Sequence, residues 1–253
     1  MIDARTRFSD RVANYIRYRP SYPPELVTTI LDELDNRGKP LVADLGSGTG
    51  IFTQLLLERG LKVYAIEPNT NMRLAAEEAL ADYGKLVSLA GDAENTGLDD
   101  ASVDLITAAQ AFHWFNNEPT RAEFARILKA DGRLALVWNQ RRLSQPFQQA
   151  YDALLRELAP DYGKVNHMNL STDDIAGFFA AGTMQQRCFD NRQQLDFDSL
   201  RGRLESSSYC PEAGSKPYHR LLEALRRLFD EHAEDGLLAF DYDTQLYHGS
   251  IAR

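Results

Sequence analysis

Cysteine is scarce in this chain of 253 residues. Only Cys188 and Cys210 occur, and neither belongs to a CxxC motif or to a Cys/His pattern with metal-ligand spacing. The sequence therefore indicates neither a zinc site nor a redox site, and we predict no bound metal. We expect two reduced thiols that are partly buried.

The chain also lacks an excess of positive charge. Its 28 Lys and Arg residues stand against 37 Asp and Glu residues, which gives a formal net charge of -9. An acidic surface repels phosphate backbones, so we do not expect nucleic acid as the main partner. Two local basic pairs, Arg141-Arg142 and Arg226-Arg227, are predicted to lie on solvated surfaces or at helix ends.

Long hydrophobic runs are absent as well. No apolar stretch approaches the length of a membrane span, and no apolar stretch follows the N-terminal residues Met1 to Arg7. We therefore predict neither a secretory signal nor a membrane partner. We expect a cytoplasmic protein that acts on a small molecule, either as a monomer or as a homodimer.

The first half of the chain alternates between apolar runs and amphipathic stretches, which is typical of βαβ units and a parallel sheet. A helix is expected over 51–59, before Gly60. Another passes Phe124 and ends near Asp131-Gly132. The predicted strands are 41–45, 62–66, 86–89, 103–108 and 134–138.

The pattern changes after Arg141. Helices are expected over 144–158, over 171–180 and around Leu221 to Phe229, and strands over 187–195 and within 238–247. The stretch 206–216 is predicted to be a flexible loop or lid. We interpret 1–253 as one domain with three parts: an N-terminal lid segment (1–35), a ligand-binding core (36–141) and substrate-shaping helices with the last strands (142–253).

The most informative segment is Asp44-Leu45-Gly46-Ser47-Gly48-Thr49-Gly50, where a strand ends and a helix begins. Ligands of open parallel sheets bind at this edge. Glycines let a ligand approach the backbone closely, and the N–H groups of the following helix are exposed to it. A tight turn without a ligand is the alternative, and three glycines in five residues disfavour it.

The motif does not match a dinucleotide site fully. The third glycine of G-x-G-x-x-G falls on Ile51, and Asp44 would repel a pyrophosphate. A carboxylate there suits a ligand that carries an ammonium group. Glu67, about twenty residues after the glycines, can bind both hydroxyls of a ribose in a nicotinamide or an adenosyl ligand.

Two further strand ends carry polar or aromatic residues. Asp92 follows the third strand and could accept a hydrogen bond from an adenine amino group, or it could simply form a turn. The stretch from Gln110 to Phe115 follows the fourth strand and contains His113. His113 is a candidate general base, and a half-buried structural histidine is an equally good interpretation.

These elements, in this order, resemble the motifs of the class I methyltransferases that use S-adenosylmethionine. The resemblance covers Pro24 to Trp138. Asp44 to Gly50 resembles the first motif, Glu67-Pro68 the second and Asp92-Ala93 the third, and the end of the fourth strand resembles the fourth. Gly132-Arg133-Leu134 also fits the family.

The resemblance implies a cofactor, S-adenosylmethionine, and a set of contacts to it. Asp44, Gly46 and Gly48 would approach its methionine part, Glu67 its ribose and Asp92 its adenine. An N-terminal segment would close over the site, with Tyr15, Tyr18 or Arg19 near the methionine carboxylate. The residues expected to bind the cofactor are Tyr15, Arg19, Asp44, Gly46, Ser47, Gly48, Thr49, Glu67, Pro68, Met72, Asp92, Ala93, Gln110 and Ala111.

The chain is similar to a small-molecule branch of this family, which includes trans-aconitate and quinone methyltransferases. Tyr18 to Pro23 and Phe112 to Phe115 carry that similarity. It implies an α/β, Rossmann-like, doubly wound sheet of seven mostly parallel strands with an antiparallel last strand, plus a helical insertion or cap. The expected acceptor is a carboxylate, a phenol or quinone, or an activated carbon. An NAD-dependent oxidoreductase and a non-catalytic S-adenosylmethionine-binding module are the alternatives.

Overall fold

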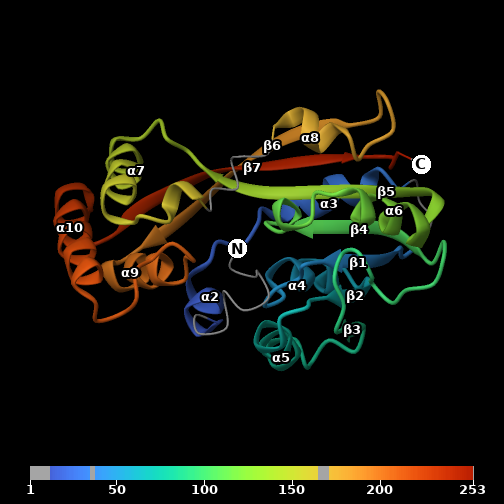
Figure 1. The fold of residues 1–253 in the computed structure, drawn as a ribbon, viewed down its shortest axis with the longest axis horizontal. Helices are drawn as coiled ribbons and strands as arrows, with labels where there is room; N and C mark the ends of the chain where they lie inside the picture. The colour runs from blue at the N-terminus through green and yellow to red at the C-terminus, as the bar shows by residue number, and fades with distance from the viewer. Residues whose placement is uncertain (1–11, 35–37, 165–170, 253) are drawn as a thin grey trace.

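The computed structural model describes residues 12–34, 38–164 and 171–252, and its centre is one seven-stranded sheet (Figure 1). The strand order is β3-β2-β1-β4-β5-β7-β6. The strands are β1 (Leu41–Leu45), β2 (Lys62–Ile66), β3 (Leu86–Leu89), β4 (Val103–Ala109), β5 (Leu128–Arg141), β6 (Gln185–Leu195) and β7 (Leu238–Gly249). This arrangement confirms the predicted Rossmann-like sheet.

Six strands of the sheet point in one direction, and β7 points in the opposite direction. The strands from β3 to β5 pair in parallel, whereas β7 is antiparallel to both β5 and β6. Parallel pairing brings the carboxyl ends of β1, β2 and β4 to one edge, beside the loops that carry the sequence motifs. The predicted antiparallel last strand is therefore confirmed, and it lies between β5 and β6.

Apolar side chains bury both faces of this sheet. One cluster joins β1 and β4 to helix α6 (Glu118–Ile127) and helix α8 (Thr172–Ala176), through residues such as Phe124 and Ile175. The cluster on the other face joins the sheet to α3 and α4, through Leu26 and Leu56. The helices of the two faces, together with α5, are α3 (Pro24–Asp32), α4 (Ile51–Glu58), α5 (Thr70–Ala79), α6 (Glu118–Ile127) and α8 (Thr172–Ala176).

A third apolar cluster lies away from the first two and forms a cap. It contains Tyr151, Leu204 and Leu225 together with Phe240 of β7, all of them buried. Figure 1 shows β6 and β7 running from the main sheet into this group of helices. The cap helices are α7 (Pro146–Leu158), α9 (Phe197–Glu205) and α10 (Lys216–His232).

The N-terminal helix α2 (Val12–Tyr18) packs against α9 of the cap. Gly202 makes this contact close, because a Cβ atom on it would lie 2.1 Å from the Tyr18 ring. Any larger residue at 202 would displace the ring, since real Cβ contacts are never so short. The short 3-10 helix η2 (Phe112–Trp114) follows β4 at the edge that faces α2 and the cap.

Two predicted helix ends were wrong, and one helix of the cap was not predicted. Helix α6 ends at Ile127 and not near Gly132, because Leu128 is extended and pairs with Val103 as the start of β5. Helix α8 stops at Ala176 because Phe179 forms a β-bridge with Ile251. The sequence analysis also missed α9, whose interior contains Gly202.

The structure also places the cysteines and tests for a membrane span. Cys210 is buried, whereas Cys188 is exposed on β6, so the expectation of partial burial holds for neither. Within 12–34, 38–164 and 171–252, the apolar stretch of every helix is too short for a bilayer crossing.

We expect Phe112→Ala to lower the free energy of unfolding by about 3–5 kcal/mol. The Phe112 ring is fully buried and contacts the rings of Phe115, Trp138 and Phe178, so the truncation leaves a cavity where η2 joins the sheet. Urea unfolding measures the change. Leu74→Ala, at a side chain that is 54% exposed, is the matched control and should change stability little. Equal effects of both substitutions would contradict this packing.

Candidate active site

A cavity of about 560 Å³, called here the larger cavity, opens at the carboxyl ends of β1, β2 and β4. This volume lies in the range that binds cofactors and drug-sized ligands. Every residue predicted to bind the cofactor lines it, with Arg19 as the exception. The lining residues from that prediction are Tyr15, Asp44, Gly46, Ser47, Gly48, Thr49, Glu67, Pro68, Met72, Asp92, Ala93, Gln110 and Ala111.

The glycine turn fits closely against its neighbours. Gly46 has a φ of +64°, and a Cβ atom on it would lie 2.7 Å from the Cβ of Ala111. Gly46 N–H donates a hydrogen bond of 2.9 Å to the Ile66 carbonyl, which fixes the turn against β2. The left-handed backbone and the lack of space both require glycine here.

Asp44 lies at the floor of the larger cavity and is 1% exposed. Its two carboxylate oxygens accept hydrogen bonds from the hydroxyls of Thr107 (2.7 Å) and Thr53 (2.6 Å). The pKa of Asp44 is raised to about 6. Burial is the main cause and the nearby charge of Glu67 adds to it, whereas the hydrogen bonds from Thr53 and Thr107 lower the pKa. Negative charge at this position is therefore poorly compensated by the protein alone.

Glu67 is the second buried carboxylate, at the end of β2. Its Oε2 accepts a hydrogen bond from the Gly48 N–H (2.9 Å), and its Oε1 accepts one from the Asn69 N–H (2.8 Å). Burial raises its pKa, while these two N–H groups lower it. Each carboxylate oxygen has a second lone pair, so Glu67 can still accept two hydroxyls.

Asp92 forms the turn that was one of the two interpretations from the sequence, and its contact with an adenine stays a prediction. Its Oδ1 accepts hydrogen bonds from the backbone N–H groups of Glu94 (3.1 Å) and Asn95 (2.9 Å), which makes an Asx turn. The residue also lines the larger cavity together with Ala93. The turn therefore positions the Asp92 carboxyl at the cavity wall.

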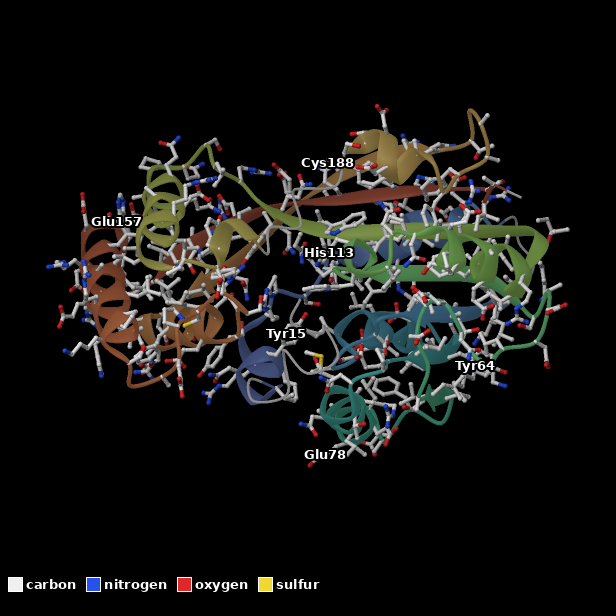
Figure 2. The ribbon with its side chains drawn as sticks, viewed as in Figure 1. Tyr15, Tyr64, Glu78, His113, Glu157 and Cys188 are labelled. Atoms are coloured by element: carbon white, nitrogen blue, oxygen red, sulfur yellow. The ribbon has the colours of Figure 1, made fainter. Side chains whose placement is uncertain are left out.

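A second cavity of about 110 Å³, called here the smaller cavity, adjoins the first one. Both cavities are lined by Tyr15, Tyr22, Ile51, Gln110 and Trp114. His113 and Arg19 line only the smaller cavity, so the structure separates Arg19 from the other predicted cofactor residues. Figure 2 shows Tyr15 and His113 in the middle of the molecule, between the sheet and the cap helices.

Gln110 stands at the boundary of the two cavities in an unusual conformation. Its φ is +55°, which costs energy for a residue with a side chain. The side-chain amide donates a hydrogen bond of 3.1 Å to the Asn139 carbonyl, and the backbone N–H donates one of 2.8 Å to the Val137 carbonyl. These bonds hold Gln110 between β4 and β5.

Two buried arginines line the smaller cavity and were not predicted from the sequence as site residues. Arg141 was predicted to lie on a solvated surface, but its side chain is only 13% exposed. The reason is that β5 continues to Arg141, and strand alternation puts Asn139 and Arg141 on the face that lines the cavity. Arg203 of α9 is 5% exposed. The neighbouring Arg142 instead pairs with Asp190 and Asp243, and Arg226-Arg227 are exposed as predicted.

The arginines change the electrostatics of Tyr209, another lining residue that the sequence analysis did not select. Burial raises the pKa of Tyr209. The positive charges of Arg141 and Arg203, together with a hydrogen bond from Ser207 and the charge of Arg19, lower it below its ordinary value. The smaller cavity is therefore positive and the floor of the larger cavity is negative. In the part of the chain that the structure describes, no group of three His, Cys, Asp or Glu side chains is placed to hold a metal ion.

Comparison with known proteins identifies the family. Residues 43–136 match the family model of a methyltransferase domain. An uncharacterised methyltransferase from Mycobacterium tuberculosis is 35% identical over 257 residues, which cover 99% of this chain and 98% of the relative. An uncharacterised methyltransferase-like protein from Schizosaccharomyces pombe is 34% identical and covers 97% of this chain and 95% of that protein.

Solved structures share the fold. A protein from Anaeromyxobacter dehalogenans, described as a type II methyltransferase, superposes with a TM-score of 0.69 at 23% identity, covering 92% of this chain and 98% of that one. A protein from Anabaena variabilis, described as a methyltransferase from an antibiotic biosynthesis pathway, gives a TM-score of 0.59 at 24% identity, with the same coverage. The sheet order, the glycine turn and the relatives agree: this chain belongs to the class I methyltransferases that use S-adenosylmethionine.

Proposed function

We propose that this enzyme transfers the methyl group of S-adenosylmethionine to a small-molecule acceptor bound in the smaller cavity. The observation that carries the proposal is the common wall of the two cavities, where Gln110 and Trp114 line both. A cofactor in the larger cavity and an acceptor in the smaller one would meet at this wall. Methyl transfer requires that contact, because the acceptor must approach the methyl group in line.

The larger cavity fits the cofactor chemically. Its buried carboxylates, Asp44 and Glu67, both have raised pKa values, so a ligand with ammonium and sulfonium cations would relieve their repulsion. We assign the methionine part of the cofactor to the turn from Gly46 to Thr49 and the ribose hydroxyls to Glu67. Asp92 and Ala93 are assigned to the adenine, and Pro68 and Met72 complete the same wall.

The protein itself has little covalent work in this reaction. S-adenosylmethionine supplies a methyl group that is already activated by its sulfonium. The chain binds and orients the acceptor, and it keeps water away. Tyr15 and Trp114 stand at the common wall, where aromatic faces attract cations.

His113 is proposed as a general base for an acceptor that must lose a proton. It lines the smaller cavity, and its ring packs on Trp114 with 4.9 Å between the centroids. This position is on the acceptor side of the common wall, where a base is needed. A carboxylate acceptor would need no base at neutral pH.

We place the chain with the small-molecule methyltransferases, near the trans-aconitate and quinone enzymes. Both segments that carry this similarity contribute to the smaller cavity: Arg19, Pro20 and Tyr22 come from the first, and His113 and Trp114 from the second. Membership of the methyltransferase family decides against the NAD-dependent alternative.

Radiolabelled methyl transfer tests the function. Purified protein and S-adenosylmethionine with a labelled methyl group are incubated with a cell extract that has been divided by size. We expect label in the small-molecule fraction, because the smaller cavity holds about 110 Å³. Label that appears only in protein or nucleic acid would contradict the proposal. Protein with Glu67→Gln, which weakens the assigned ribose contact, is the negative control.

We expect Asp44→Asn to stabilise the free protein while it weakens the binding of S-adenosylmethionine. The folded-state pKa of about 6 lies above the ordinary value of 3.8. Asp44 therefore contributes most stability below pH 3.8, and that contribution is lost as the pH rises through about 6. A pKa difference of about two corresponds to about 3 kcal/mol of unfolding free energy. The variant should therefore be more stable than the wild type by up to that amount at pH 7.

Urea unfolding at pH 7 and pH 5 measures the gain, which should shrink at pH 5. Calorimetric titration with S-adenosylmethionine measures affinity, which should rise through pH 6 in the wild type and stay about tenfold lower in the variant. Asp99→Asn, at an exposed loop position, is the control for charge removal. A variant that is less stable at pH 7 would show that the charge of Asp44 supports the fold.

We expect His113→Ala to lower the turnover number by about 100-fold or more and to leave cofactor affinity nearly unchanged. The reason is that His113 lines the acceptor cavity and not the larger one. Initial rates with the acceptor found by labelling give the turnover number, and titration with S-adenosylhomocysteine gives the affinity. Unchanged turnover at saturating acceptor would remove the general base from the mechanism.

A further inference from the structure

The wall of the smaller cavity that belongs to the cap contains two largely buried guanidinium groups. Arg141 comes from the end of β5 and Arg203 from α9. They lie close enough to act on each other electrostatically. Neither residue falls within 43–136, the part that matches the family model.

Arg203 has polar and aromatic neighbours but no counter-charge. Its Nε donates a hydrogen bond of 2.5 Å to the Tyr242 hydroxyl, and its guanidinium stacks over the Phe240 ring at 4.6 Å. Its Nη1 is buried without a hydrogen-bond partner. Among the residues that the structure describes, none provides a carboxylate within 4.0 Å of Arg203.

Arg141 shares a single carboxylate with another arginine. Its Nη2 contacts the Tyr162 hydroxyl and lies 3.5 Å from Asp152, whereas Arg156 binds the same Asp152 at 2.6 Å. The Nη1 of Arg141 is buried without a partner, as is the Nε of Arg19 in the same cavity. Positive charge around the cavity therefore exceeds the negative charge that the described side chains bring to it.

A buried guanidinium without a counter-ion is destabilising, because it has lost its water and gained no anion. Arginine does not lose its proton to relieve this, and stacking on one aromatic ring returns only part of the lost free energy. Arg203 has no counter-ion, and Arg141 shares its single carboxylate with Arg156. Both arginines line one cavity and each has an unpaired N–H donor, so together they form a site for an anion. A planar fork of N–H donors fits a carboxylate or phosphate oxygen pair.

We propose that Arg141 and Arg203 bind an oxyanion of the methyl acceptor, a carboxylate or a phosphate group, at the cap side of the smaller cavity. The proposal rests on the function proposed above. It gives the acceptor an orientation: its anionic group lies on the cap, and its opposite end points to Gln110 and Trp114 at the common wall. The acceptor is then a small anion, and the two arginines select it.

Thermal unfolding with and without added anions tests the site. The wild-type protein, saturated with S-adenosylhomocysteine, is titrated with sodium succinate, with sodium phosphate and with sodium chloride at matched ionic strength. We expect succinate or phosphate to raise the melting temperature in a saturable way and chloride to have no such effect. Whichever of succinate and phosphate raises the melting temperature at the lower concentration identifies the oxyanion as a carboxylate or a phosphate. An equal response to chloride would overturn the proposal.

Substitutions then locate the site. We expect Arg203→Met and Arg141→Met each to lower the affinity for the anion by at least about tenfold, as measured by calorimetry. Arg203→Lys keeps the charge but loses the fork, so it should also weaken binding. Arg201→Gln removes a charge from the same helix at a side chain that is 43% exposed, and it should bind the anion as the wild type does. Equal affinity in the wild type and in Arg203→Met would overturn the proposal.

Stability gives a second readout that does not depend on any ligand. Without anions, Arg203→Met should melt at a higher temperature than the wild type, because the substitution removes a buried charge and keeps the volume. A lower melting temperature would show that the guanidinium serves the fold. Binding of S-adenosylhomocysteine is measured separately. If the protein binds the anion but not S-adenosylhomocysteine, the proposed function is rejected and the anion site stands. If it binds S-adenosylhomocysteine but not the anion, the anion site is rejected and the proposed function stands.

Discussion

The pairing of β7 with β5 holds the two halves of the molecule in one arrangement. Eight consecutive register pairs run from Leu134 with Gly249 to Arg141 with Tyr242. The second half of β7 belongs to the main sheet, whereas Leu238, Phe240 and Tyr242 belong to the cap cluster. Because one strand serves both cores, the cap cannot move far from the sheet without breaking backbone hydrogen bonds. The same pairing fixes Arg141 of β5 and Tyr242 of β7 side by side in the wall of the smaller cavity.

The two cavities have opposite electrostatic character, which the overall charge of -9 conceals. Carboxylates are buried at the floor of the larger cavity, and arginines are buried in the smaller one. Gln110, in its left-handed conformation, separates them. Among the described residues, neither Asp44 nor Glu67 forms an ion pair with an arginine of the smaller cavity. Each set therefore remains available to a ligand of the opposite sign.

The sequence predicted the sheet and the larger cavity well, and the reason is local. Each strand from β1 to β4 is a short apolar run, and the residues predicted to bind the cofactor follow it closely in the chain, as Gly46, Glu67 and Asp92 do. Parallel pairing then brings those strand ends together whatever the rest of the chain does. Knowledge of the strand order was not needed to select these residues.

The smaller cavity could not be predicted in this way. Arg141 lines it because β5 continues past the apolar run and is held there by β7, a strand about a hundred residues later. Arg203 is buried by Tyr242 and Phe240, which are also distant in the sequence, and α9 has few apolar residues to reveal it. Long-range packing thus decides where these charges lie, and single-sequence patterns record only short-range order.

The close contact of Tyr18 with Gly202 has a consequence for redesign of this enzyme. The contact joins the N-terminal helix, which supplies Tyr15 to both cavities, to the helix that carries Arg203. A chimera that exchanges the cap of this chain for that of a relative must therefore exchange the N-terminal segment with it. If the grafted cap has a side chain in place of Gly202, that side chain would collide with the Tyr18 ring and shift the helix that carries Arg203.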